Sequence, residues 1–338
     1  MISTKCFVDA AFHNFNAGTL KNAAKAYVEH VESGGKMLIT LAGAMSTARI
    51  GFLLAEMIRN GKVHAICSTG ANLEEDLLLL LAGHRYANVD ARESTAFSDT
   101  KLLNGRYNRV ADVAIPEDAI NALGDILIPL WDKAYANRTS DLPHRYINKA
   151  ITLGKFPEYD TDASWVLAAY EAGIPIYVPG WADSSLGNIF VARALAKRDR
   201  KYLDVVLSDT HYMIDLVQTY QRWCKTGDTG LFQIGGGIAG DFPICVVPLI
   251  NQDYVPTEKA QGLRVCDVNY LTVDEAPVKP WRYFCQVTDA VESYGGYSGA
   301  APSEKISWGK FDADTEYFSV NSDATIVAPL IFAYVLGW

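Results

Sequence analysis

Short runs of apolar residues alternate along the chain with longer segments in which apolar residues recur every three to four positions. The short runs predict buried strands, and the longer amphipathic segments predict helices between them. In chain order we expect helix 19–33, strand 36–41, helix 47–61, strand 63–68, helix 74–83, helix 165–173, strand 174–180, strand 202–208, helix 211–223 and strand 230–237. This alternation predicts a Rossmann-like, doubly wound α/β fold with a mostly parallel sheet and helices on both faces.

Residues 92–160 interrupt this alternation with segments such as IPEDAINALGDILIPLWDKAYAN, which predict a helical insertion with loops. No Pro-, Gly- or Ser-rich linker divides the chain, so we expect one domain over residues 1–338. Gly34 and Gly35 are expected to end the first helix. Asn72 is the predicted N-cap of helix 74–83, with Glu75 as its capping-box partner.

The composition is that of an ordinary globular protein, with 338 residues of which 49% are apolar and 20% charged. The formal charge of -9 argues against a nucleic-acid or anionic-membrane partner and favours small cationic partners. No apolar run approaches about 18 residues, and the N-terminus lacks a basic region followed by an apolar one. We therefore expect no membrane span and no signal peptide, and a cytoplasmic protein.

The cysteines do not form a metal or disulfide pattern. They are scattered without a C-x-x-C pair, and several lie in apolar runs: Cys6, Cys67, Cys224, Cys245, Cys266 and Cys285. This distribution is typical of reduced thiols in a protein core. The six histidines are equally dispersed, and we predict no metal site.

Four glycine-containing stretches lie where predicted strands end, at residues 41–48, 67–76, 179–188 and 234–240. In open parallel sheets this edge binds ligands, since glycines let the backbone approach phosphate and helix N-termini face anions. The four stretches together could hold a dinucleotide, although no G-x-G-x-x-G follows the first strand. Each stretch alone fits an ordinary helix-entry turn equally well.

Several carboxylates lie near the same predicted strand ends: Glu74, Glu75, Asp76, Asp183, Asp241, Glu304 and Asp323. They could bind ribose hydroxyls or a cation. For residues 74–76 the alternative is that they complement the dipole of their own helix from its first turn. Asp323 precedes TIVAPLIFAYV and could simply cap the last helix.

The stretch SEKISWGK places Trp308 and Lys310 on either side of Gly309. On a surface turn, the lysine would be one of many solvated charges. In a pocket, the indole could exclude water from an amine whose free pKa is about 10.4 and which must lose its proton to form an imine. Gly309 would then leave room for a substrate.

The segment SGAAPSEKISWGK (298–310) resembles the deoxyhypusine synthase family, whose S-G-A-x-P-x-E-x-x-S-W-G-K segment carries an imine-forming lysine. The resemblance extends over most of the chain in the order of the family's segments: LAGAMSTARIGFLLAEMIRNG, CSTGANLEEDL, ADSSLGN, IGGGIAGDF and NSDATIVAPLIFAYV. An ordered match of this extent identifies the chain as a member.

The resemblance implies a reaction in which NAD oxidises spermidine, the lysine captures an aminobutyl group as an imine, and an acceptor amine takes it before reduction. It implies Lys310 as the imine-forming lysine, with substrate contacts from Trp308 and Glu304. The implied NAD contacts are Ser46, Thr69, Gly70, Glu75, Asp183, Ser298 and Asp323. It also implies a homotetramer with active sites at a subunit interface.

Three positions of the implied amine pocket depart from the family pattern. Asp241 stands where the eukaryotic enzymes have a histidine, Asn188 where they have an aspartate, and Tyr297 where an aspartate precedes S-G-A. The acceptor therefore stays open between a lysine of a translation factor and a small amine such as putrescine, which would give homospermidine.

The sequence also bears on two other classes of function. A non-catalytic paralogue that binds NAD has no chemical reason to keep Lys310, Trp308 and Glu304. An NAD-dependent deacylase or dehydrogenase would need a catalytic histidine, and His84 and His211 are expected to be structural.

Overall fold

The computed structural model describes residues 2–90, 96–157, 160–254, 274 and 276–338. The chain forms two compact units. Unit 1 comprises Met1–Ala42, Asn60–Cys67 and Thr210–Trp338, and unit 2 comprises Gly43–Arg59 and Ser68–Asp209. Neither unit is a continuous stretch of sequence, so one domain over the whole chain stays a prediction. Cys266 lies outside the described residues.

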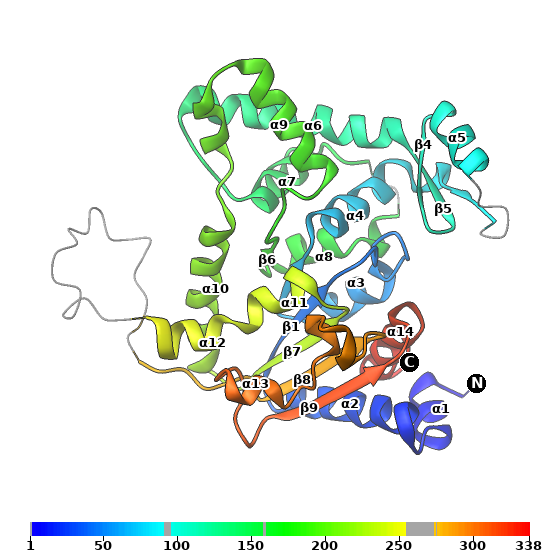
Figure 1. The fold of residues 1–338 in the computed structure, drawn as a ribbon, viewed down its shortest axis with the longest axis vertical. Coiled ribbons are helices and arrows are strands. Elements are labelled where there is room, and N and C mark those ends of the chain that lie inside the picture. Colours follow the sequence, from blue (N-terminus) through cyan, green and yellow to red (C-terminus); the bar gives the residue numbers. More distant parts are fainter. Residues whose placement is uncertain (1, 91–95, 158–159, 255–273, 275) are drawn as a thin grey trace. The chain divides into compact units, whose positions relative to one another are not determined.

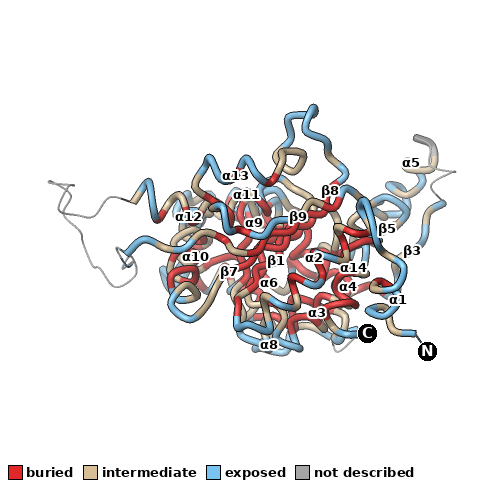
Figure 2. Tube along the Cα trace, turned by 90° about the horizontal axis from the view of Figure 1, so that it is seen from below, coloured by how far each residue is buried: buried red, intermediate tan, exposed pale blue. Residues whose placement is uncertain are grey.

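Unit 1 contains a sheet whose strands lie in the order β2 (Ala65–Ser68), β1 (Lys36–Leu41), β7 (Thr229–Ile234), β8 (Tyr283–Thr288) and β9 (Glu316–Asn321) (Figure 1). β7 pairs in parallel with β1 and with β8, and β8 pairs in parallel with β9. The residues of β7 and β8 are all buried, as Figure 2 shows along the tube. Strands buried on both faces read as continuous apolar runs, which is why the sequence located them.

Helices cover both faces of this sheet. Phe232 of β7 contacts Tyr27 of α2 (Phe15–Glu32) and Phe332 of α14 (Ala324–Leu336), with ring centroids 5.9 and 5.6 Å apart. The next residue, Gln233, lies against Gly240 of α11 (Gly237–Ile244). Successive strand residues point to opposite faces. The predicted α/β fold, with a parallel sheet between helices, is therefore confirmed.

The remaining elements of unit 1 are short, apart from one long helix. They are α1 (Thr4–Ala11), α10 (Asp209–Cys224), α12 (Val246–Pro248), the π-helical turn η5 (Leu249–Asp253), the 3-10 turns η6 (Glu292–Tyr294) and η7 (Tyr297–Gly299), and α13 (Glu304–Ser307). The described residues include no helix long and apolar enough to cross a membrane.

Unit 2 is mostly helical. Its helices are α3 (Gly51–Arg59), α4 (Gly70–Ala82), α5 (Ala96–Asn104), α6 (Glu117–Asn137), α7 (Pro143–Thr152), α8 (Trp165–Ala172) and α9 (Ser185–Lys197), with 3-10 turns η1 (Gly83–Arg85), η3 (Thr161–Ala163) and η4 (Arg200–Val205). Its strands are β3 (Ala87–Asn88), β4 (Tyr107–Val110), β5 (Val113–Pro116) and β6 (Ile176–Tyr177). α4 packs against α6, α8 and α9, and β5 pairs antiparallel with β3 and β4.

Several local predictions need correction. The segment 202–208, predicted as a strand, begins inside the 3-10 helix η4, where Tyr202 and Val205 are buried. α4 begins at Gly70 with Thr69 as its N-cap, so the predicted cap at Asn72 is wrong. The predicted helical insertion contains α5, α6 and α7 but also the hairpin strands β4 and β5. A short apolar run does not by itself distinguish a strand from a buried helical turn.

Candidate active site

A cavity of about 560 Å³ in unit 1 contains most of the predicted amine-site residues. Its walls come from α11, α12, η5, η7, α13 and the residues around them: Asp241, Cys245, Pro248, Leu249, Gln252, Asp253, Tyr297, Ala300, Glu304, Lys305, Trp308 and Lys310. The structure therefore brings Lys310, Trp308, Glu304, Asp241 and Tyr297 together around one space.

Lys310 is buried and its amine is held by one carboxylate. Its Nζ lies 3.1 Å from Oδ1 of Asp241, on α11. The ring centroids of Tyr297 and Trp308 lie 5.8 and 5.9 Å from the same nitrogen. The Trp308 side of the cavity is open, because this residue is 66% exposed. Tyr297 and the surrounding protein, more than the indole, shield the amine within this unit.

The backbone around Lys310 is fixed from both sides. Its N–H donates to the Lys305 carbonyl at 3.0 Å, and its carbonyl accepts from the Trp281 N–H at 3.4 Å. The next residue, Phe311, packs on Phe284 of β8 with ring centroids 5.0 Å apart. These contacts tie the SWGK segment to the sheet.

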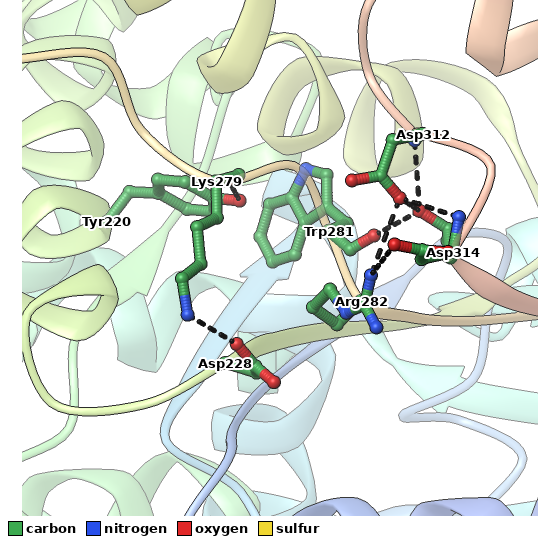
Figure 3. Close-up of polar contacts among 8 residues, drawn as sticks. Tyr220, Asp228, Lys279, Trp281, Arg282, Asp312 and Asp314 are labelled. Carbon is green, nitrogen blue, oxygen red and sulfur yellow. Dashed lines mark hydrogen bonds and ion pairs between the residues drawn. The ribbon is translucent and has the colours of Figure 1, made fainter.

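Figure 3 shows polar contacts that hold the chain before β8 and after Lys310. The Tyr220 hydroxyl donates to the Lys279 carbonyl at 2.8 Å, and Lys279 pairs with Asp228 at 3.1 Å (Figure 3). Arg282 pairs with Asp312 and Asp314 at 3.5 and 3.7 Å. The chain just after Lys310 is thus tied to the residues that precede β8 by contacts outside the cavity.

Gly309 is required by the backbone. Its φ is +69°, and a Cβ at this position would lie 2.1 Å from Nε2 of Gln252 on η5. Residues other than glycine rarely adopt this left-handed conformation. Gly309 therefore allows a left-handed turn and the close approach of Gln252. The sequence had predicted a different role, which was to leave room for a substrate.

Tyr297 and Glu304 occupy different parts of the cavity wall. The Tyr297 hydroxyl donates to Oε1 of the buried Gln233 at 3.1 Å, and burial raises the pKa of this phenol. Glu304 is exposed at the start of α13. Its carboxylate is therefore free to meet a cationic group entering from solvent.

The predicted cofactor residues of unit 2 lie where three of the glycine-containing stretches meet. Gly70 approaches Trp181 and Ser184 so closely that a Cβ would lie 2.9 Å from the Trp181 carbonyl oxygen. The Ser46 hydroxyl donates to the Asn72 carbonyl at 2.7 Å and accepts from Trp165 Nε1 at 3.0 Å. The Ser46 hydroxyl and the lack of a side chain at Gly70 thus have structural roles, and cofactor contact by these two residues stays a prediction.

Thr69, Asp183 and Asn188 also belong to unit 2. The Thr69 hydroxyl caps α4 by accepting from the Asn72 N–H at 3.3 Å. Asp183 lies just before α9 and Asn188 lies on it, and both are exposed. Cofactor contact by Thr69 and Asp183, and amine contact by Asn188, stay predictions.

The carboxylates at 74–76 lie beyond the first turn of α4 and serve other segments, so their predicted role at the start of their own helix is wrong. Glu74 accepts the Ser185 and Leu186 N–H groups of α9 at 3.0 and 2.8 Å. Asp76 accepts the Trp165 and Val166 N–H groups of α8, each at 3.2 Å. The two acids complement helix N-termini that are distant in sequence.

Glu75 is the member of this group that best fits a hydroxyl-bearing ligand. Its Oε2 accepts the Thr47 N–H at 3.2 Å, and burial raises the pKa of its carboxyl group. The Thr47 hydroxyl is buried and has no hydrogen-bond partner among the described residues. An unsatisfied buried hydroxyl beside a carboxylate fits the hydroxyl groups of a ribose.

Ser298 and Asp323 are the predicted cofactor residues of unit 1. Ser298 lies in η7 against Gly236, where a Cβ would be 2.6 Å from the serine Cβ. Asp323 follows β9 and accepts the Thr325 N–H at 2.8 Å as the N-cap of α14. The capping alternative for Asp323 is confirmed, and its contact with a cofactor stays a prediction. Within the described residues, no group of three or more His, Cys, Asp or Glu side chains could hold a metal ion.

The sequence model of the deoxyhypusine synthase family matches residues 9–335, which is nearly the whole chain. The chain belongs to the deoxyhypusine synthase family. Two relatives illustrate the similarity. The "Probable deoxyhypusine synthase 2" of Archaeoglobus fulgidus is 29% identical over 96% of this chain and 94% of its own length. The "Deoxyhypusine synthase-like protein" of Cyanothece sp. is 29% identical over 99% of this chain and 80% of its own.

A crystal structure of a "putative deoxyhypusine synthase" from Entamoeba histolytica has a similar fold. The TM-score is 0.56 and the sequence identity 12%, over 99% of this chain and 94% of that one. At this identity the likeness concerns the fold, which agrees with the parallel sheet and flanking helices of unit 1.

In this family member, sequence reasoning missed Lys305. It lies in α13 between the two predicted site residues Glu304 and Trp308, and it is 4% exposed. Its Nζ lies 5.1 Å from the ring centroids of both Phe284 and Tyr297. Burial, and then the positive charge of Lys310, lowers the Lys305 pKa to about 8. A lysine in a polar stretch usually faces solvent, so the sequence carried no signal for this residue.

Proposed function

We propose that this protein transfers an aminobutyl or related amine group from a polyamine such as spermidine, through an imine on Lys310, in an NAD-dependent reaction. The observation that carries the proposal is the position of Lys310. Its buried amine lines a cavity of about 560 Å³ beside Asp241, Tyr297 and Trp308. A covalent lysine intermediate requires an amine that faces substrate and is shielded from bulk water.

A bound dinucleotide would supply the reversible hydride transfer that oxidation of the donor amine and reduction of the product require. Glu75 and Thr47 of unit 2 are the residues we propose to hold it, because the buried carboxylate and the unsatisfied hydroxyl lie beside each other. We also propose that the segments around four further residues of unit 2 contact the dinucleotide: Asp183, Thr69, Gly70 and Ser46.

The residues of unit 1 would handle the amine. Asp241 fixes the Lys310 Nζ at 3.1 Å and can hold the proton that this amine must lose before it attacks. The lysine nitrogen then bonds to the oxidised carbon of the aminobutyl group, and the bond from that carbon to 1,3-diaminopropane breaks. Glu304 offers a carboxylate to the cationic end of the substrate.

Trapping the covalent intermediate tests this proposal. Borohydride added during turnover with NAD and spermidine should leave a stable mass increment on Lys310. The Lys310→Arg variant should lose the adduct, and its transfer rate should fall by several orders of magnitude, because a guanidinium stays protonated and is not nucleophilic. NAD binding should survive.

Lys305 is the matched control for the site of the adduct, because it lines the same cavity and is close to Lys310 in the sequence. Fragmentation must therefore assign the modified residue, and Lys305→Met should still form the adduct. An adduct on Lys305, or near-normal transfer by Lys310→Arg, would contradict the proposal.

The acceptor has two candidates, a lysine of a translation factor and a small amine such as putrescine. Asp241 and Tyr297 line the cavity wall, which supports substrate selection by departures from the family pattern. Mass spectrometry of free amines and protein after incubation with NAD, spermidine and putrescine distinguishes the two acceptors, since homospermidine would indicate small-molecule transfer.

The triple variant Asn188→Asp, Asp241→His, Tyr297→Asp should shift the preference among amines. A non-catalytic role would give no turnover with either acceptor.

We also propose a homotetramer with its active sites at a subunit interface. The 66% exposure of Trp308 supports this arrangement, because a large aromatic residue beside a catalytic lysine would then be covered by another subunit. Light scattering after size-exclusion chromatography measures the assembly. A monomeric protein in this measurement would contradict the proposed homotetramer.

A further inference from the structure

The Lys305 side chain is almost fully buried and lines the cavity, and its amine has no hydrogen-bond or ion-pair partner among the described residues. It is 4% exposed, whereas ordinary lysines keep their ammonium in water. A buried ammonium is costly unless it is paired. A side chain in this situation, facing an open cavity, is suited to a ligand that supplies the missing partner.

The groups around Lys305 do not supply that partner. The rings of Phe284 on β8 and Tyr297 on η7 lie 5.1 Å from its Nζ and attract it only weakly. Of the charged groups that act on it, Glu304 and Asp241 attract and Lys310 repels. Asp241 is already paired with Lys310 at 3.1 Å.

The cavity wall therefore offers two kinds of charge to a ligand. Lys305 offers a cation without a protein partner among the described residues, and Glu304 and Asp253 offer exposed carboxylates. A fully cationic diamine could use the acids, but one of its ends would add a third positive charge near Lys305 and Lys310. A molecule with an ammonium at one end and a carboxylate at the other could pair its ammonium with the acids and its carboxylate with Lys305.

We infer that Lys305 binds a carboxylate of the acceptor, so that the acceptor is a small aliphatic amine bearing a carboxylate. This inference rests on the proposed function for the transfer step. In that step the bond from the aminobutyl carbon to 1,3-diaminopropane breaks and a bond from the same carbon to the acceptor nitrogen forms. The proton leaves the acceptor nitrogen for 1,3-diaminopropane. The hydride taken from the donor is returned, so no further oxidant or reductant is needed.

Binding of two ligands of matched length tests the inference without turnover. Putrescine and 4-aminobutanoate both carry an ammonium on a short chain and differ in the charge at the other end. Calorimetry on the full-length protein should give at least tenfold tighter binding of 4-aminobutanoate, as expected for one charged hydrogen bond. Lys305→Met should remove this preference, and Lys305→Arg should retain it.

Lys5→Met is the matched control. Lys5 also lies over an aromatic ring, with its Nζ 5.5 Å from the Tyr334 centroid, but it is exposed and outside the cavity. This variant should bind both ligands as the natural protein does. Equal or weaker binding of 4-aminobutanoate relative to putrescine, or an unchanged preference in Lys305→Met, would overturn the inference.

Turnover separates this inference from the proposed function. With NAD and spermidine, 4-aminobutanoate should yield N-(4-aminobutyl)-4-aminobutanoate and 1,3-diaminopropane, and Lys305→Met should lose this product while keeping the borohydride adduct on Lys310. Absence of the adduct would refute the proposed function. An adduct with transfer to putrescine but not to 4-aminobutanoate would refute only the carboxylate acceptor.

Discussion

Replacing Lys305 by Met should make the protein more stable at neutral pH, and this gain should disappear in alkaline solution. Methionine has a similar length and can keep the contacts with Phe284 and Tyr297 without the charge. Burial, together with the charge of Lys310, lowers the Lys305 pKa from 10.5 to about 8. At about 1.4 kcal/mol per pKa unit, this shift corresponds to about 3 kcal/mol of lost stability when the amine is charged.

The sign and the pH window follow from proton binding. Below pH 8 the Lys305 amine is protonated in both the folded and the unfolded chain, so the full cost is present. Between pH 8 and 10.5 the unfolded chain binds more protons, so the stability of the natural protein rises relative to the variant. Cation–π attraction of about 0.5 to 2 kcal/mol offsets part of the cost. The expected gain at pH 7 is therefore about 1 to 3 kcal/mol.

Urea unfolding, followed by tryptophan fluorescence at pH 7, 9 and 10.5, measures these differences. The natural protein, Lys305→Met and the control Lys5→Met should be compared at each pH. The control should show no such pH-dependent gain. A Lys305→Met variant less stable than the natural protein at pH 7, or a difference that stays constant up to pH 10.5, would refute the reasoning.

Three further predictions concern the site and its supports. Glu74→Gln should lower the free energy of unfolding by about 1 to 3 kcal/mol, because it weakens a buried carboxylate that accepts two N–H groups of α9; an unchanged urea midpoint would contradict this role. Gly309→Ala should destabilise the cavity wall through both its φ of +69° and its contact with Gln252, and adding Gln252→Ala should restore only part of the loss. Full rescue in urea unfolding would show that the backbone is unstrained. Glu304→Gln should weaken polyamine binding about tenfold in calorimetry and leave NAD binding intact, whereas equal loss of both would indicate a structural role.

The sequence by itself determined the parts of this protein that depend on local patterns. Buried strands such as 36–41 and 230–234 were recognisable because continuous apolar runs bounded by glycines are characteristic of parallel sheets. Asp323 was recognisable as a cap because capping is made within two residues. The motif around Lys310 and the ordered family segments along the chain identified the family, and the family model matches residues 9–335.

Tertiary structure alone decided which groups meet. Lys310 and Asp241 are 69 residues apart, and Glu74 and Ser185 are 111 apart, so no local pattern links either pair. Segment 202–208 has the composition of a strand, yet packing turns its first part into a 3-10 helix. Lys305 and its exposed neighbour Glu304 are both charged residues of one polar stretch, so the sequence predicts the same exposure for both. Only the aromatic surface of Phe284 and Tyr297 buries one of them, because burial depends on what the fold places against a side chain rather than on its neighbours in the chain.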